Sequence, residues 1–346
     1  MRLVKYSNLV EFHKELLNKV GLDNFSNNSV TTGLCETSLR GVDSHGVRLL
    51  PHYVNSALNG RKNPKPIFDF KQVFPAIGHL DADNGFGHAA GMLAIDYGMQ
   101  MAENEGVGVV AVSNSSHPGA MASMALKAAR KGYMSFAFTH ADSLVLSYNG
   151  TRPYFGTNPI CFAAPRLDKD PYCLDMATSI TAWNRILVHK NENKPLPDGI
   201  AVDSKGYATS DPHAAAAVLP TGEYKGYGLA SMVEVLCGIY TGMDFGRSIA
   251  SMYKAPIDQP RGLGQFYIVM RTDGIISKDF FIERMQEMTQ EVRLEPGMNG
   301  ESVMLPGDKE IYEAEKRMIS GVPIDDITAD AFKKLSVEYS VPIDIL

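Results

Sequence analysis

Cysteine and long apolar runs are both scarce in this chain of 346 residues. Its four cysteines show neither a CxxC spacing nor a zinc-binding pattern, so reduced and mostly buried thiols are expected, which suits the cytoplasm. The most apolar helical stretch, Tyr227 to Thr241, contains Glu234 and is too short to span a bilayer. The first residues are interrupted by charges and lack a signal core. A membrane is therefore not an expected partner.

An excess of basic residues is also missing. Lysine and arginine number 33 against 39 aspartates and glutamates, which gives a formal net charge of −6. Without a cluster of lysines and arginines, nucleic acid is not an expected partner. The hydrophobic fraction of 45% is ordinary, so an ordered chain is expected, and its length allows two domains.

Several catalytic motifs are absent as well. The sequence has no GxSxG nucleophile elbow and no HExxH motif, and His140 with Asp142 lacks a third metal ligand, so no bound metal is expected. Residues Gly85 to Gly91 read GxGxxxG. No apolar strand precedes them, and no acidic residue ends a second strand about 20 positions later. A Rossmann dinucleotide-binding fold is therefore not expected.

The spacing of apolar residues predicts helices at both ends of the chain and alternating strands and helices between them. Helices are predicted near residues 7–20, 27–39 (capped by Asn27 or Asn28), 48–60, 88–105, 120–131, from 180, 225–240, 279–292, 308–319 and 329–339. Strands are predicted near residues 66–83, 106–112, 134–141, 160–164, 172–176 and 264–271, and a loop over 190–213. We expect a mixed α/β (α+β) fold, with a helical domain of residues 1–66 with 296–346 and an α/β domain of residues 67–295.

The stretch Gly41 to Tyr53 reads GVDSHGVRLLPHY and is the first candidate site. Since Pro51 is well tolerated only in the first turn of a helix, a helix is predicted to begin near Arg48, with Ser44 and His45 at its mouth. Such an N-terminus favours a bound carboxylate or phosphate and keeps His45 unprotonated near neutral pH. The guanidinium of Arg48 suits a carboxylate.

A second histidine stands in a similar place. His117 lies in Ser115 to Gly119, where a predicted buried strand gives way to a helix, and Pro118 is predicted to mark the helix start. One such histidine more often has a capping role than a catalytic one. Two in the same kind of position favour a functional role, because ligands bind at strand ends of this type.

Four further loops lie where strands and helices meet. They are Phe155 to Pro159, Asp175 to Ser179, Tyr224 to Gly228 and Pro306 to Glu310. Each also has a purely structural interpretation, as a turn, a helix cap or a solvated lysine. Lys225 at a helix start is unfavourable for the helix dipole, which a bound anion would compensate.

From these residues alone, the sequence predicts an enzyme that transfers a proton on a small carboxylate substrate. Two alternatives remain open. One is a metal-assisted lyase or hydrolase that uses the histidines and Asp142, and the other is a non-catalytic protein that binds a small anion.

Eight motifs occur in order along the chain: RGVDSHG (40–46), HPGAM (117–121), YFGTNPICFAAP (154–165), DMATS (175–179), AVDSKGYATSDP (201–212), KGYGL (225–229), GLGQF (262–266) and LPGD (305–308). With them the sequence resembles the type-2 malate/L-lactate dehydrogenase family over essentially its whole length. That family includes ureidoglycolate and sulfolactate dehydrogenases, diketogulonate reductase and cyclic imino-acid reductases.

The resemblance implies NAD-dependent interconversion of a small 2-oxo acid and a 2-hydroxy acid, with NADP as the alternative cofactor. It implies a non-Rossmann nucleotide fold in the 67–295 domain, and a homodimer. In relatives the acid/base histidine is assigned to the position of His45 or to that of His117, and His117 is favoured for a ureidoglycolate-like substrate. We expect Ser44 to act with these histidines in catalysis, and Arg48 and Tyr53 to contact the substrate. The implied cofactor residues are Asn158, Asp175, Met176, Ala177, Thr178, Ser179, Lys225, Gly226, Pro306, Gly307 and Asp308.

The chain departs from the family pattern at three places. Many relatives carry arginine four residues after the first histidine, where this chain has Leu49, and its arginine is Arg48. The pair Asn184-Arg185 stands where Gly-Lys is common, and Asp308 stands where glutamate is frequent. These departures affect the expected carboxylate and cofactor contacts.

Overall fold

The computed structural model describes residues 2–167 and 170–344. Its largest sheet has seven strands in the order β2-β3-β4-β12-β5-β8-β9. The strands are β2 (Asp69–Phe74), β3 (Ile77–Asp81), β4 (Val107–Ser115), β12 (Leu263–Arg271), β5 (Tyr133–Thr139), β8 (Ile160–Ala164) and β9 (Tyr172–Met176). Only β3 and β4 pair in parallel, and the other neighbours are antiparallel. A Rossmann sheet is mostly parallel. This mostly antiparallel sheet therefore agrees with the prediction that the fold is not a Rossmann fold.

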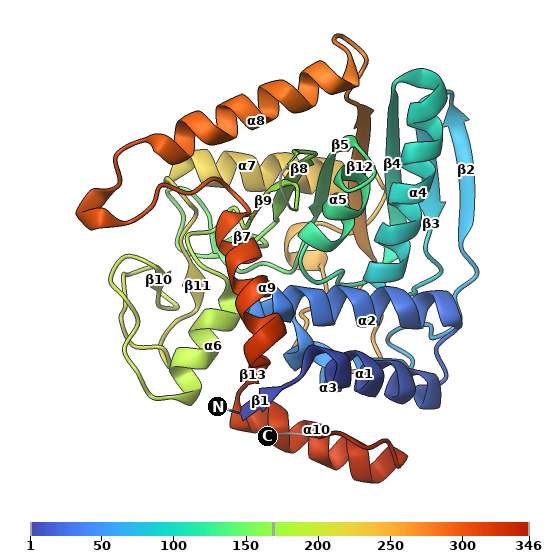
Figure 1. Cartoon of the computed structure of the whole chain (residues 1–346). Helices are drawn as coiled ribbons and strands as arrows, with labels where there is room; N and C mark the ends of the chain where they lie inside the picture. The colour runs from blue at the N-terminus through green and yellow to red at the C-terminus, as the bar shows by residue number, and fades with distance from the viewer. Residues whose placement is uncertain (1, 168–169, 345–346) are drawn as a thin grey trace.

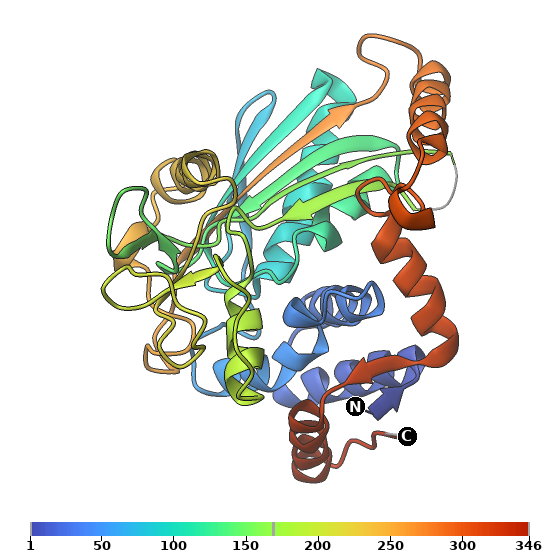
Figure 2. The same cartoon turned by 90° about the vertical axis from the view of Figure 1, so that its left-hand side faces the viewer.

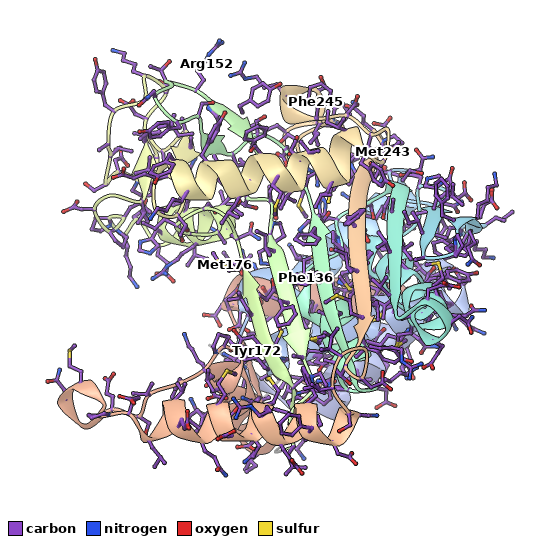
Figure 3. All side chains as sticks on the ribbon, turned by 90° about the horizontal axis from the view of Figure 1, so that it is seen from above. Phe136, Arg152, Tyr172, Met176, Met243 and Phe245 are labelled. Atoms are coloured by element: carbon purple, nitrogen blue, oxygen red, sulfur yellow. The ribbon has the colours of Figure 1, made fainter. Side chains whose placement is uncertain are left out.

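Helices cover both faces of this sheet (Figures 1 and 3). On one face α4 (Gly87–Glu105) and α5 (Ala122–Ala129) pack on Val110 and Val112. On the other, α7 (Tyr224–Glu234) continues into a π-helical turn, Val235–Ile239, and packs on Ala111. Because side chains of a strand alternate between faces, neighbouring residues of β4 enter different cores. Strand β4 therefore needs the continuous apolar run seen in its sequence.

The glycines of the GxGxxxG stretch bring α4 close to the sheet. A Cβ at Gly87 would lie 2.1 Å from the carbonyl oxygen of Ser116, and one at Gly91 would lie 2.4 Å from the Tyr267 hydroxyl. Such distances leave no room for a side chain. These glycines thus serve helix–sheet packing.

A second layer is built from helices of both ends of the sequence (Figure 2). It holds α1 (Tyr6–Val20), α2 (Asn24–Leu39), α3 (Leu50–Leu58), α9 (Asp308–Ser320) and α10 (Asp326–Tyr339). Strand β1 (Arg2–Val4) pairs with β13 (Val322–Ile324), and the rings of Phe12 and Phe332 lie 5.3 Å apart. Early and late residues therefore share one hydrophobic core.

Several predicted element boundaries are wrong for local reasons. Helix α2 begins earlier than expected, because Asp23 caps it by accepting from the amides of Phe25 and Ser26. Helix α5 begins four residues after Pro118, so this proline lies in the preceding loop. Helix α6 (Trp183–Asn191) begins after Thr178 and Ser179, which do not cap it.

Short strands and one outlying helix complete the described chain. A four-stranded sheet, in the order β10-β11-β6-β7, contains β10 (Ala201–Val202), β11 (Ala217–Val218), β6 (Val145–Leu146) and β7 (Pro153–Phe155). Strand β10 lies inside the predicted loop. Helix α8 (Lys278–Leu294) lies at the outer edge in Figure 1. Within residues 2–167 and 170–344, no helix is long and apolar enough to cross a bilayer.

Candidate active site

The fold brings the two singled-out histidines together. His45 ends a 3₁₀ turn, Asp43–His45, that joins α2 to α3, and His117 follows β4. Their rings stack, with centroids 5.7 Å apart and planes inclined by 22°. The Ser44 hydroxyl lies 2.8 Å from Nδ1 of His45. Residues far apart in sequence thus form one two-imidazole site.

Tyr53 of α3 fixes the ring of His117. Its hydroxyl lies 2.9 Å from Nδ1 and 3.2 Å from the carbonyl oxygen of His117. The amide of Gly119 also points at Nδ1, at 3.3 Å. Because an amide N–H can only donate, Nδ1 is an acceptor, and the neutral ring carries its proton on Nε2. That tautomer follows from the bonds and is typical of a histidine that donates a hydrogen bond to substrate.

Both imidazoles are held in the neutral form. Burial lowers the pKa of His45 to about 4, and the nearby charge of Arg48 adds to this effect. Burial also lowers the pKa of His117 well below its usual range, and interaction with the titratable His45 and with the cations Arg261 and Lys62 lowers it further. The sequence argument expected a neutral His45 from a helix dipole. The direction agrees, but the helix begins only at Leu50, and burial is the larger cause.

Arg48 occupies a second 3₁₀ turn, Val47–Leu49, and is half-buried. Leu49 is 3% exposed and packs in the helical core. The charge of Arg48 acts on both His45 and Tyr253. Arg48 therefore lies beside the histidine pair. Leu49, at the position where many relatives carry arginine, packs in the hydrophobic core instead.

The turn that carries His45 is held by the C-terminal part of the chain. Arg317 of α9 donates to both carboxylate oxygens of Asp43, at 2.6 and 3.0 Å, and to the carbonyl oxygen of Ser38 at 2.7 Å. A bidentate arginine–carboxylate pair fixes orientation as well as distance. The position of Ser44 and His45 thus depends on α9.

Two adjacent basic residues that the sequence analysis missed are buried near this site. Arg61 and Lys62 are 1% and 2% exposed. The Arg61 guanidinium donates to the carbonyl oxygens of Met252 at 2.7 Å, Ala255 at 3.0 Å and Pro256 at 2.5 Å. Nothing in a Gly-Arg-Lys-Asn stretch after a helix distinguishes it from an exposed turn, so no sequence signal identified these residues.

A third missed cation, Arg261, anchors the same loop. It donates to Asp142 at 2.5 Å and to the carbonyl oxygen of Ala250 at 2.8 Å. Burial and the repulsion between these neighbouring cations lower the pKa of Arg261 and of Lys62, with Asp142 as the carboxylate bound to Arg261; the basic side chains still gather in one region. Such a region suits an anionic substrate.

Asn184, one of the departures from the family pattern, connects this site with α6. Its amide donates to the carbonyl oxygen of Ser44 at 2.9 Å and accepts from the Tyr253 hydroxyl at 3.2 Å. The ring of Tyr253 lies 5.6 Å from that of His52. Glycine at position 184 would provide neither side-chain bond.

The three segments expected to bind a cofactor meet along β9. At one end of the strand, the amide of Cys173 donates to the carbonyl oxygen of Pro306 at 3.3 Å. Beyond the other end, the amide of Thr221 donates to the carbonyl oxygen of Thr178 at 2.9 Å, just before Lys225 opens α7. Figure 3 shows Tyr172 at the end of β9 near α8 and Met176 at the end near α7.

Glycines bring the backbones of these segments into close contact. A Cβ at Gly226 would lie 2.2 Å from the carbonyl oxygen of Thr221, and Gly307 has a φ of +94° against Cys173. Lys225 is exposed, and Ala177 is half-buried. Open backbone at a helix start, with an exposed cation beside it, fits the phosphates of a dinucleotide.

Several candidate side chains already have protein partners. The Asn158 amide donates to Glu234 at 2.6 Å and accepts from the amide of Ala141 at 3.1 Å. The Asp308 carboxylate accepts from Arg166 and Arg293, each at 2.8 Å. Although burial opposes it, the Arg293 bond is the largest cause that lowers the pKa of Asp308, to about 2.

The other candidates on β9 and after it are also held by local bonds. The Thr178 hydroxyl donates to the carbonyl oxygens of Thr157 and Asn158, both at 3.1 Å, and Ser179 donates to that of Thr181 at 2.8 Å. Asp175 accepts from the amide of Ala122, at the start of α5, at 2.8 Å. These bonds shape the loop from which backbone groups face outward.

The residues weighed for a metal are placed differently. Nε2 of His140 accepts from the amide of Gly264 at 2.8 Å, while Asp142 binds Arg261. Among the residues that the structure describes, no three histidine, cysteine, aspartate or glutamate side chains lie close enough to hold a metal ion.

The fold and the site together define a mixed α/β protein with a half-buried pair of histidines, cations around that pair, and a separate candidate dinucleotide site. A family model described as malate/L-lactate dehydrogenase matches residues 4–333. The chain therefore belongs to this family, which confirms the resemblance in the motifs.

Individual relatives agree along nearly the full length. The chain is 33% identical over 322 residues to ureidoglycolate dehydrogenase (NAD(+)) of Escherichia coli (strain K12), with 91% of each chain covered. It is 30% identical over 298 residues to (2R)-3-sulfolactate dehydrogenase (NADP(+)) of Chromohalobacter salexigens, covering 85% of this chain and 86% of that protein. The crystal structure of malate dehydrogenase from Entamoeba histolytica superposes with a TM-score of 0.93 at 27% identity and 99% coverage of both chains.

Proposed function

We propose that this protein transfers a hydride between NAD(P)H and a small 2-oxo acid, with the 2-hydroxy acid as the product of reduction. The observation that carries the proposal is the stacked pair of His45 and His117, ringed by the cations Arg48, Lys62 and Arg261. Proton donors beside a region that attracts carboxylates are what this reaction needs. The relatives, named as ureidoglycolate, sulfolactate and malate dehydrogenases, support the same class.

The carboxylate of the substrate is assigned to Arg48. Its half-buried guanidinium lies beside His45, and among the described residues no carboxylate pairs with it. A bidentate arginine–carboxylate pair would fix the 2-oxo group relative to the imidazoles. Tyr53, expected to contact the substrate, is 0% exposed and bonds to His117, so it acts through that imidazole.

His117 is assigned as the acid/base group. Its Nε2–H gives a proton to the developing alkoxide in reduction and recovers it in oxidation. His45, oriented by Ser44, supplies a second hydrogen bond to the same oxygen. The proposal is supported by the tautomer of His117, which places a proton on Nε2, a nitrogen with no hydrogen-bond partner among the residues that the structure describes.

The cofactor is assigned to backbone groups of Asp175–Ser179, to Lys225 and Gly226, and to Pro306–Asp308. When bound, NAD(P)H supplies the hydride. Asn158 and Asp308 serve by holding these segments in place. Relatives named for NAD(+) and for NADP(+) support NAD, with NADP as the alternative.

The test follows nicotinamide absorbance with purified protein. Glyoxylate derivatives, pyruvate, oxaloacetate and sulfopyruvate are supplied in turn, once with NADH and once with NADPH. Oxidation of either cofactor by one of these acids establishes the reaction class. A folded protein that oxidises neither, and that also fails with cyclic imines and sugar-derived oxo acids, refutes the proposal.

Two other functions remain as outcomes of that test. A metal-assisted lyase or hydrolase would act without nicotinamide and would lose activity in EDTA. A non-catalytic anion-binding protein would bind a carboxylate with no turnover.

A homodimer is part of the proposal, supported by the surface of α8. Of the 17 residues in this helix only Thr289 is buried, while Phe280 and Met288 are 48% and 41% exposed. An exposed apolar helix face of this kind marks an interface. Light scattering on a size-exclusion column gives the mass, and Met288→Glu should shift a dimer toward monomer.

The domain division and the location remain proposals as well. Two main hydrophobic clusters, one in the helical layer and one around the large sheet, support domains at residues 1–66 with 296–346 and at 67–295, although Phe86, Ala89 and Met252 of the second domain also pack in the first cluster. Unpaired buried cysteines support the cytoplasm.

A further inference from the structure

Lys62 has an unusual environment. The side chain is 2% exposed, and its Nζ lies 3.5 Å from the centre of the Tyr53 ring and 4.9 Å from that of Phe86. Within the described part of the chain, this Nζ has no hydrogen-bond partner. An ammonium stripped of water, without a carboxylate, is unfavourable, and two aromatic faces offset only part of that cost.

The neighbours of Lys62 make its charge less favourable still. Burial lowers its pKa well below the usual range, and the charges of Arg261 and Arg61 add to this. The titratable and charged groups that face the cluster are His45, His52, Tyr53, His88, His117, Arg61 and Arg261, with Asp142 already bound to Arg261. Its contacts with the two aromatic rings do not by themselves account for a lysine at this position. The reason for it must therefore lie in the charge itself.

We propose that Lys62 is a positioning residue for proton transfer that acts through Tyr53 on His117. The inference rests on the proposed dehydrogenase function. Tyr53 contacts both other groups: Nζ of Lys62 lies over the face of its ring, 3.5 Å from the centre, and its hydroxyl lies 2.9 Å from Nδ1 of His117. A cation on the ring face stabilises negative charge on the phenol and makes its hydroxyl a stronger donor.

Proton transfer along this path balances without forming a charged imidazole. In reduction, the substrate carbon gains the hydride and the electron pair of the C=O bond moves to oxygen. The Nε2–H bond of His117 breaks as its proton forms the O–H bond of the product. The O–H bond of Tyr53 breaks as its proton joins Nδ1. Tyr53 is left as a phenolate facing the Lys62 ammonium and regains a proton from solvent after product release.

This path explains why positive groups surround His117. They disfavour an imidazolium, as the lowered pKa of His117 shows. Burial also raises the pKa of Tyr53, so its phenolate needs nearby positive charge; Arg261 opposes the rise, and the Lys62 ammonium on the ring face is placed to do the same. The path never requires the disfavoured ion. Lys62 supplies the charge closest to the ring on which the negative charge rests.

The test is a double-mutant cycle on the full chain with Lys62→Met and Tyr53→Phe. Lys65→Met is the matched control, since Lys65 is exposed three residues further along the same loop. Lys62→Met is expected to lower kcat by about 10- to 30-fold and to enlarge the solvent deuterium isotope effect. The Kd for NADH, from its fluorescence, should stay unchanged. Added to Tyr53→Phe, Lys62→Met should change kcat by less than about twofold, because the path is already broken.

Two results overturn the inference: kcat for Lys62→Met equal to that of the wild type, or a further loss of about tenfold when it is added to Tyr53→Phe. Lys62→Leu carries the same comparison if the methionine variant does not fold. If the wild-type protein fails to oxidise NAD(P)H with every acid tested, the proposed function itself is refuted. The two failures are therefore distinct.

Discussion

Replacing Lys62 with methionine should make this protein more stable while making it a slower enzyme. The substitution keeps an unbranched side chain in the space between Tyr53 and Phe86 and removes an unpartnered nitrogen. Stability and activity then change in opposite directions, which is expected where a site retains an unfavourable charge for function.

The size of the gain follows from opposing terms. An unpartnered buried polar group costs about 1–3 kcal/mol, and more when it is charged. In the wild type, contact of the ammonium with the rings offsets up to about 2 kcal/mol of this cost. In the variant, contact of the methionine sulfur with the same rings contributes about 0.3–1.5 kcal/mol of stability. A net gain of about 1–2 kcal/mol corresponds to a Tm higher by roughly 1–3 °C for a chain of 346 residues.

The Tm difference between Lys62→Met and wild type should also change with pH, in a direction set by the pKa of Lys62. Because the pKa of Lys62 is lowered in the folded protein, the unfolded chain binds the extra proton, and wild-type stability rises with pH up to the unfolded value. The Tm difference between Lys62→Met and wild type should therefore be larger at pH 7 than at pH 10. Thermal unfolding followed by circular dichroism measures it, with Lys65→Met as the control. A lower Tm at pH 7, or a difference that does not shrink at pH 10, would refute the reasoning.

Three further predictions concern the site itself. His117→Ala should lower kcat by about 10²–10⁴-fold in steady-state assays, with His45→Ala less severe and both folds intact. Wild-type turnover in both would contradict the assignment. Arg48→Leu should raise KM about 10- to 100-fold for the acid but leave KM for NADH unchanged, since a charged hydrogen bond is lost. Burial keeps the pKa of His117, the assigned acid/base group, well below its usual range, so protonation of this imidazole should produce no limb in kcat/KM near pH 6.5. A limb centred near pH 6.5 would show that the histidines are not buried as described.

Local sequence predicted the strands of the sheet well but not their arrangement. The runs 160–164 and 172–176 form β8 and β9 as predicted, because short apolar stretches between turn residues leave little choice. The antiparallel order that places β12 between β4 and β5 depends on pairing between distant segments. Likewise β1 and β13 are three residues long and exist only because they pair with each other.

The candidate site shows the same division. His45, His117 and Arg48 could be found because each stands beside a turn or helix start that sequence reveals. Lys62 could not, because adjacent basic residues after a helix usually face solvent, and only tertiary packing buries them. Candidate residues beside recognisable turns and helix starts could thus be predicted from the sequence. A lysine that only tertiary packing buries could not.

The bidentate ion pair between Arg317 and Asp43 affects when the candidate site can form during synthesis. The turn that carries Ser44 and His45 leaves the ribosome early, but the residue that orients it is added almost at the end. A nascent chain can therefore fold its sheet without a working centre. Activity should appear only once α9 has emerged, so ribosome-stalled or prematurely terminated chains are inert toward metabolites in the cell.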